Sequence, residues 1–179
     1  MASDNEKVIS PLPSVDSPVS CFDTNKFEPD KLTSEIFPSG NGANKPESSS
    51  FVIDYVYIES LGNALDFGDQ THANREGAGV CNSTRGVFMG GRLAPGTSQT
   101  TIDYVTLSSG GGGDDFGEIA SGAVHFMEGC SNQIRGMSMG GYDGSNRTRN
   151  ISFVTIASTG DSSTFGSLSA AATSQTASC

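Results

Sequence analysis

Short runs of β-branched and aromatic residues alternate with Gly- and Ser-rich segments from residue 51 onward. The first run, VIDYVYI, extends from Val52 to Ile58, and similar runs extend from Thr101 to Leu107 and from Asn150 to Ile156. Runs of this composition, bounded by turn-forming residues, predict β-strands. Both faces of the first run are largely apolar, which predicts a strand covered on both sides. After residue 50 we find no helical pattern, so we expect an all-β fold.

These runs belong to a longer internal repeat. The copies begin at Ile53, Ile102 and Ile151, so that the spacing is 49 residues. A fixed period of this length is typical of repeat architectures. Several residues recur at the same step, and we expect them to form the buried core of each repeat, with the Phe as its large apolar side chain: Phe67, Phe116, Phe165, Cys81, Cys130 and Cys179. We expect the three cysteines to be buried, reduced and not joined in disulfides, because equivalent positions in neighbouring repeats rarely lie within bonding distance.

Each repeat is predicted to contain about four short strands. A less regular strand follows the Phe-Gly element, near Ala73 to Cys81 and again near Ser121 to Cys130, and its small side chains indicate a crowded, innermost position. The next strands, starting at Arg85 and Arg135, end in Gly-Gly pairs. We expect both arginines to be structural, reaching carbonyl groups or carboxylates across the repeat. Residues 51–179 would hold about 2.6 repeats.

Residues 1–50 have a different composition, with six of the seven prolines and all four lysines of the chain. We interpret them as an extended N-terminal docking arm and linker that becomes ordered on a partner surface. Lys31 to Phe37 could make one helical turn. A plain flexible tail is the alternative, but the arm carries more apolar anchors than a solvated tail needs. The candidate docking residues are Phe22, Phe27, Ile36 and Phe37.

The net charge is −10, which argues against nucleic acid as a partner, because phosphate contacts need a basic surface. No apolar run is long enough to cross a membrane, so we expect no membrane insertion. His72 and His125 do not recur with the repeat, and we expect both at the surface or in turns. Asp114 and Asp115 are predicted to lie in a solvated turn, and Gly110 to Gly113 in a slack hairpin turn. We therefore expect no metal or other cofactor and no enzymatic activity.

The order of the Gly-Gly strand end, the turn, the aromatic strand and the bulky aromatic residue resembles the kelch-like β-propeller, with Phe where kelch repeats usually carry Trp. More narrowly, the amino-acid sequence of the repeats over residues 51–179 resembles tandem repeats in virion proteins of marine tailed bacteriophages. This resemblance implies kelch-like four-stranded repeats of about 49 residues. A closed propeller has at least four blades, more than this chain supplies.

Two functions remain open at this point. The resemblance implies a structural virion protein of a tail fibre, collar or capsid decoration, which docks by its arm and presents its repeats for host attachment. Its partners would be other virion proteins or copies of itself, and its location the virion. The alternative is a carbohydrate-binding or glycan-acting propeller on host-surface glycans. That alternative would need exposed loop aromatics, of which Tyr142 is the one clear candidate.

Overall fold

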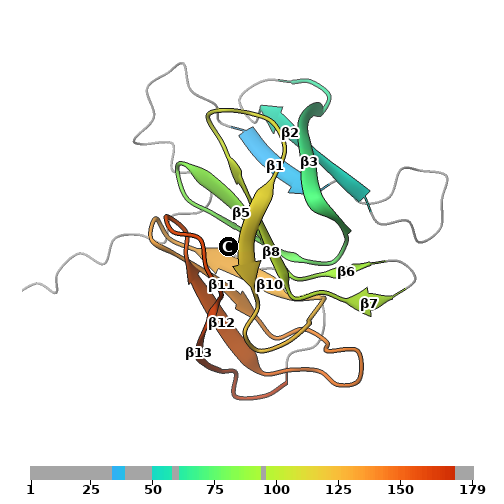
Figure 1. The fold of residues 1–179 in the computed structure, drawn as a ribbon, viewed down its shortest axis with the longest axis vertical. Coiled ribbons are helices and arrows are strands. Elements are labelled where there is room, and N and C mark those ends of the chain that lie inside the picture. Colours follow the sequence, from blue (N-terminus) through green and yellow to red (C-terminus); the bar gives the residue numbers. More distant parts are fainter. Residues whose placement is uncertain (1–33, 39–49, 58–60, 94–95, 172–179) are drawn as a thin grey trace, which may run out of the picture.

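A computed structural model describes residues 34–38, 50–57, 61–93 and 96–171; the side chains of 34–38 and 50 are not described. This part of the chain contains strands and no helix, which confirms the all-β prediction. Its strands form three main antiparallel sheets and one small hairpin (Figure 1).

The middle and last sheets have the same four-stranded meander. The middle sheet has the order β4-β5-β8-β9, and the last has the order β10-β11-β12-β13. The strands of the middle sheet are β4 (Ala78–Cys81), β5 (Arg85–Met89), β8 (Thr101–Thr106) and β9 (Asp114–Glu118). Those of the last sheet are β10 (Glu128–Ser131), β11 (Arg135–Met139), β12 (Asn150–Thr155) and β13 (Ser163–Ser167). Between β5 and β8 lies the hairpin of β6 (Arg92–Leu93) and β7 (Thr97–Ser98). Four strands in each repeat were therefore predicted correctly.

The first sheet consists of β1 (Ser34–Pro38), β2 (Ser50–Tyr57) and β3 (Leu65–Asn74), in that order. Strand β1 pairs with β2 in the same way that β5 pairs with β8, since Ser34 lies opposite Tyr57 and Arg85 lies opposite Thr106. The helical turn expected at residues 31–37 is therefore wrong, because pairing with β2 supplies the backbone hydrogen bonds of this segment.

This pairing also assigns two of the candidate docking residues. Ile36 and Phe37 lie in β1, opposite Tyr55 and Asp54 of the chain's own first sheet. Phe22 and Phe27 lie outside the described residues. The arm predicted over residues 1–50 thus includes a strand of the first repeat, and docking by the arm stays a prediction.

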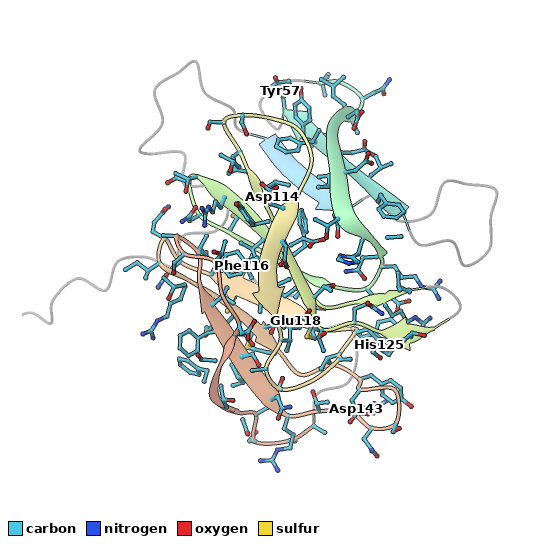
Figure 2. The ribbon with its side chains drawn as sticks, in the orientation of Figure 1. Tyr57, Asp114, Phe116, Glu118, His125 and Asp143 are labelled. Carbon is cyan, nitrogen blue, oxygen red and sulfur yellow. The ribbon has the colours of Figure 1, made fainter. Side chains whose placement is uncertain are left out.

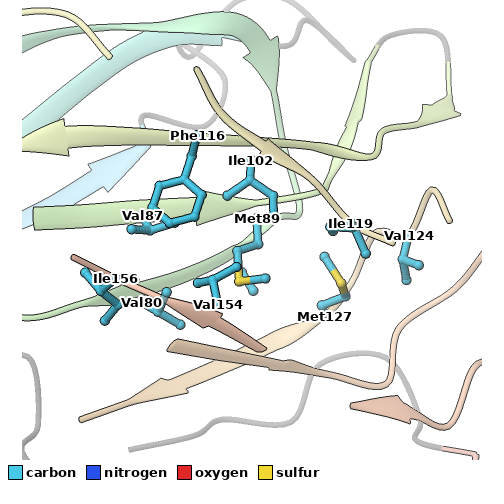
Figure 3. Packing of buried hydrophobic residues seen from close by; sticks show 11 residues of the cluster. Val80, Val87, Met89, Ile102, Phe116, Ile119, Val124, Met127, Val154 and Ile156 are labelled. Atoms are coloured by element: carbon cyan, nitrogen blue, oxygen red, sulfur yellow. The ribbon is translucent and has the colours of Figure 1, made fainter. Parts of the chain in front are cut away.

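The three sheets pack face to face in the order of the sequence, with an apolar layer between each pair (Figures 1 and 3). The layer between the first and middle sheets contains Ile53, Phe88 and Val105, with Phe67 and Leu107 packed against it. The larger layer between the middle and last sheets includes Val87, Met89, Ile102, Phe116 and Val154. Strand β5 contributes to both layers because successive side chains point to opposite faces.

Candidate functional site

The repeated Phe is the extra residue of a β-bulge. In the middle sheet Ile102 lies opposite Gly117 and the next residue, Asp103, lies opposite Asp115, so that Phe116 has no partner residue in β8. The same shift occurs in the other two sheets, at Phe67 and Phe165. A bulge bends its strand and redirects a side chain. Here the bulge presents the Phe ring on the face that the next sheet covers.

The three Phe side chains are equivalent in position but differ in burial. Phe116 is 3% exposed beneath the last sheet, Phe67 is half-buried against the middle sheet, and Phe165 is 55% exposed. Each ring contacts an aromatic ring of the neighbouring strand edge to face: Tyr55, Tyr104 and Phe153, with centroids 6.1, 5.9 and 6.1 Å away. The predicted core role is confirmed for Phe116 and holds in part for Phe67. It is wrong for Phe165, because no sheet formed by the described residues covers that ring.

Backbone hydrogen bonds join each sheet to the turn of the following one. The amide of Gly111 donates to the Phe67 carbonyl at 2.9 Å, and one repeat later the amide of Gly160 donates to the Phe116 carbonyl at 2.7 Å. A second bond accompanies each, from Gly113 to Asp69 and from Ser162 to Glu118. The turn at Gly110 to Gly113 is therefore tied to the first sheet, and the prediction of a slack turn is wrong.

The Gly after each Phe makes this close approach feasible. A Cβ atom on Gly68 would lie 2.4 Å from the Gly111 carbonyl carbon, and one on Gly117 would lie 2.6 Å from that of Gly160. Both glycines also have φ angles that side chains rarely adopt, 144° and 149°. At Gly68 and Gly117 no other residue fits both the conformation and the space.

Arg85 also crosses this interface. Its guanidinium lies 4.5 Å from the ring centroid of Tyr104, and its Nη1 donates to the carbonyl of Ile156 at 3.1 Å. Arg135 lies over Phe153 in the equivalent pose, at 4.9 Å. The predicted structural role, reaching a carbonyl, is confirmed for Arg85.

The first strands of the middle and last sheets, β4 and β10, are also in close contact. A Cβ on Gly129 would lie 2.5 Å from the carbonyl oxygen of Gly79, which confirms the crowding expected from the small residues here. Beyond these strands the Asn82 side chain donates to the Gln133 carbonyl at 3.2 Å. The middle and last sheets are thus joined at both edge strands of the middle sheet, at β4 through β10 and at β9 through the turn at Gly160.

The cysteines do not behave as the sequence suggested. Cys81 lies opposite Gly86 in its hairpin, whereas Ser131 lies opposite Gly136, so the structural equivalent of Cys81 is Ser131 and not Cys130. The extra residue of the second copy therefore precedes the cysteine. Cys81 is disulfide-bonded and Cys130 is a thiol, and both are half-buried. The expectation of a buried, reduced thiol is wrong for Cys81, and Cys179 lies outside the described residues.

At the ends of β3 and β5 the interface continues as a polar corner. Glu76, which has a positive φ of 63°, lies close to Arg75 and forms an ion pair with Arg92, whose Nε lies 2.8 Å from the Glu76 carboxylate. The Arg92 guanidinium also lies 5.6 Å from the centroid of the Phe126 ring in the next repeat. Sequence reasoning missed this corner because nothing in the residue types marks Glu76 or Phe126 as positions of positive φ.

His125 occupies the place of Arg75 in the next repeat. It is 2% exposed, packs against Phe126 and Tyr142, and its Nδ1 lies 2.9 Å from the Ser98 hydroxyl (Figure 2). Burial lowers the pKa of His125, and the positive charge of Arg92 lowers it further. The surface position predicted for His125 is wrong; His72, with half of its side chain exposed, is at the surface as predicted.

A shallow groove of about 350 Å³ lies beside this corner. It is lined by Glu76 to Gly79 and Phe126 to Gly129, the equivalent segments of two successive repeats. Burial raises the pKa of Glu128 in this groove. Within the described residues no three His, Cys, Asp or Glu side chains gather as a metal site. Asp114 and Asp115 are exposed as predicted, although they open β9 instead of lying in a turn.

No protein-family model and no curated protein matches this chain. Among the described residues there is also no helix long and apolar enough to span a membrane. The contact of the middle sheet with the last is therefore the strongest candidate site: the bulged Phe116, Gly117 in backbone contact, and Arg85 over an aromatic ring. The first sheet repeats the Phe and the Gly, and the last sheet repeats the Phe and the Arg, so the site is one for joining a sheet to the next.

Proposed function

We propose that this chain is a structural protein of a tailed-phage virion, in a tail fibre, collar or capsid decoration. In this role it docks through its N-terminal region onto other virion proteins or copies of itself, and it presents its β repeats for host attachment. The observation that supports an assembly role is the interface repeated from sheet to sheet, in which Phe116, Gly117 and Arg85 all serve to join sheets. The assignment to a virion rests on the resemblance of the repeat sequences to tandem repeats of phage virion proteins.

We further propose that the sheets are blades of a kelch-like propeller. Two features support this: each full sheet is a four-stranded meander, and the first strand of the middle sheet, β4, contacts the first strand of the last sheet, β10. A propeller would require further blades, since a ring needs at least four and the described residues form three sheets.

The test of the virion role is the composition of the particle. Purified particles of the phage that encodes this chain should contain it in a fixed ratio to the other particle proteins, measured by quantitative mass spectrometry. A chain found in infected cells but absent from washed particles would overturn the proposal.

Docking can be tested by truncation. Removal of residues 1–33 should abolish incorporation into particles while leaving the β signal in circular dichroism unchanged. The cut must precede Ser34, because removing β1 would damage the first sheet. Incorporation of the truncated chain at the normal ratio would contradict docking by the arm.

The glycan-binding alternative receives less support. Tyr142 is half-buried and its ring packs edge to face on His125, so it does not present an open aromatic face. A glycan array probed with the full chain separates the two proposals, because strong selective binding to one glycan would favour the alternative.

A further inference from the structure

The two ends of the stack differ from its interior in what covers them. The outer face of the last sheet, which we call the tail face, carries Met137, Met139, Ile151, Phe153 and Phe165. None of these residues is buried: four are half-buried and Phe165 is 55% exposed.

The matching face of the middle sheet is covered by the last sheet. Four residues that occupy the places of tail-face residues are between 0% and 3% exposed there: Val87, Met89, Ile102 and Phe116. The same apolar pattern thus occurs twice, once buried between two sheets and once at the end of the stack. A cluster of exposed apolar side chains on a sheet is a mark of an interaction surface.

The opposite end of the stack also repeats an interior surface. The outer face of the first sheet, which we call the head face, includes Asp54 and Val56 and the turn residue Gly62. The middle sheet turns the equivalent residues toward the first sheet. There Asp103 is 4% exposed and bonds to the Thr71 hydroxyl at 2.6 Å, and Val105 is 1% exposed. The head face is therefore the counterpart of the surface that binds a preceding sheet.

Two glycines at the ends complete this correspondence. Inside the stack, Gly68 and Gly117 approach the backbone of Gly111 and Gly160 so closely that a Cβ would overlap it. At the tail, Gly166 stands in the place of Gly117; at the head, Gly62 stands in the place of Gly111. Among the described residues, nothing lies within 4 Å of a Cβ built on Gly62 or Gly166. Gly166 and Gly62 thus occupy the two positions that contact each other in the interior pairs Gly68–Gly111 and Gly117–Gly160.

We propose that the tail face of one chain binds the head face of a second copy, so that chains stack head to tail. The second copy is the partner of choice because its first sheet offers the surface that the last sheet already offers to the middle sheet. Gly166 would contact Gly62 of the second copy. Arg135, posed over Phe153 as Arg85 is over Tyr104, would donate to a carbonyl of that copy.

This inference rests on one part of the proposed function, the assembly of the chain with copies of itself, and specifies how that assembly occurs. The particle experiment could fail while chains still stack, and stacking could fail in a chain that is incorporated into particles. Because the two surfaces differ, the interface is heterologous, and repetition gives either a ring or an open filament.

Two variants that each block one face provide the sharpest test. Gly62→Val blocks the head and leaves the tail intact, whereas Gly166→Val blocks the tail and leaves the head intact. A Cβ at either position has no described atom within 4 Å, so both variants should keep the wild-type circular dichroism. As a matched control, Gly79→Val adds the same side chain in β4 of the middle sheet, away from both end faces, where a Cβ also has no described atom within 4 Å. Its circular dichroism should likewise match the wild type, because the contact of Gly79 with Gly129 is made by the Gly79 carbonyl.

We expect the average mass of the wild-type full chain in light scattering to rise with concentration. Each blocked variant alone should remain a monomer, and an equimolar mixture of the two should form a complex of two chains. The control variant should behave as the wild type. A wild-type chain that stays monomeric at all concentrations, or a blocked variant that dimerises alone, would overturn the proposal, since the latter would show a symmetric contact.

Substitution of the tail-face Phe gives an independent measurement. Phe165→Ser should reduce association at least tenfold, whereas Ile134→Ser should leave it unchanged, although Ile134 is the more exposed side chain at 64%. Ile134 lies in the turn between β10 and β11, outside the tail face. Equal effects of the two substitutions would show that general surface hydrophobicity drives association, and the proposal would be wrong.

Discussion

The middle and last sheets are built from nearly the same repeat, yet the same residues have different surroundings in the two. Phe116 is 3% exposed and Phe165 is 55% exposed, although both are bulge residues that contact an aromatic ring on the neighbouring strand. The difference is the following sheet, which covers the first Phe, whereas no sheet formed by the described residues covers the second. In this stack, then, the repeat fixes where the Phe points, and the next repeat determines how much free energy its burial contributes.

The largest effect we expect is at this Phe. Phe116→Ala should lower the free energy of unfolding by about 3–5 kcal/mol, the usual cost of removing a buried Phe. Phe165→Ala should lower it by about 1 kcal/mol or less, because half of the ring is already in water. Urea denaturation of both variants, at a protein concentration where the wild type is monomeric, measures the difference. Equal losses would mean that Phe165 is covered as Phe116 is.

The neighbouring glycines sharpen the same comparison. Gly117→Val should cost about 1–3 kcal/mol, the usual penalty of overpacking, because the side chain would collide with the backbone at Gly160. Gly166→Val should change stability by no more than about 0.5 kcal/mol, because its surroundings are open. Thermal melting of the two variants side by side is sufficient. A similar fall in melting temperature for both would contradict a contribution from the sheet contact at Gly117.

Much of this interface could be read from the sequence. The 49-residue spacing locates the Phe and the Gly, the Arg recurs after 50 residues, and strand-forming residues locate three of the four strands in each full sheet. The bulge at Phe116 could not be read, because it appears only in the pairing of β8 with β9. Strand β1 was also missed, because SEIFP shares almost no residues with RGVFM, whose place it takes. Pairing with β2, and not local sequence, makes it a strand.

The corner at Glu76 and His125 was missed for a different reason. Aligning the repeats on cysteine places Cys130 opposite Cys81, whereas strand pairing places Ser131 there. With the one-residue shift, His125 matches Arg75 and Phe126 matches Glu76. The alignment by residue identity therefore concealed two equivalent positions with positive φ, 63° at Glu76 and 57° at Phe126.

The turns before β5 and β11 offer a smaller contrast between the same two sheets. Asn82 and Asn132 each accept two backbone amide bonds, from the residues two and three positions ahead. Asn82 in addition accepts from the Thr84 hydroxyl at 2.9 Å and donates across the interface to the Gln133 carbonyl. We expect Asn132→Ala to cost about 1 kcal/mol and Asn82→Ala about 2 kcal/mol, because the second also loses the exposed Thr84 hydroxyl bond and the bond to the next sheet.

Urea titration of the two Asn variants tests this ordering. A second substitution at Gln133 does not isolate this bond, because the Asn82 side chain donates to the backbone carbonyl of Gln133. The decisive comparison is therefore between the two single variants. A larger loss for Asn132→Ala would contradict the contribution of the bond between sheets.

The smallest effect that we expect is a pH dependence of the free energy of unfolding that arises at His125. Burial, together with the positive charge of Arg92, lowers the pKa of His125 below the ordinary 6.5. Below pH 6.5 the unfolded chain therefore binds a proton at this residue more readily than the folded chain does. Stability from His125 is complete above pH 6.5 and is lost as the pH falls from there toward the folded pKa.

Replacing His125 by Gln should remove this pH dependence. The free energy of unfolding of the wild type should fall relative to His125→Gln as the pH is lowered from 7.5 to about 5.5, measured by urea denaturation at each pH. The raised pKa of Glu128 contributes with the opposite sign, since protonation favours its buried form, but both chains contain Glu128 and its effect cancels in the difference. The expected difference is confined to acid conditions because the His125 ring is neutral in both folded and unfolded chains at high pH. Parallel curves across the whole range would mean that His125 accepts a proton in the folded chain as easily as in water, and the buried corner would then have to open in solution.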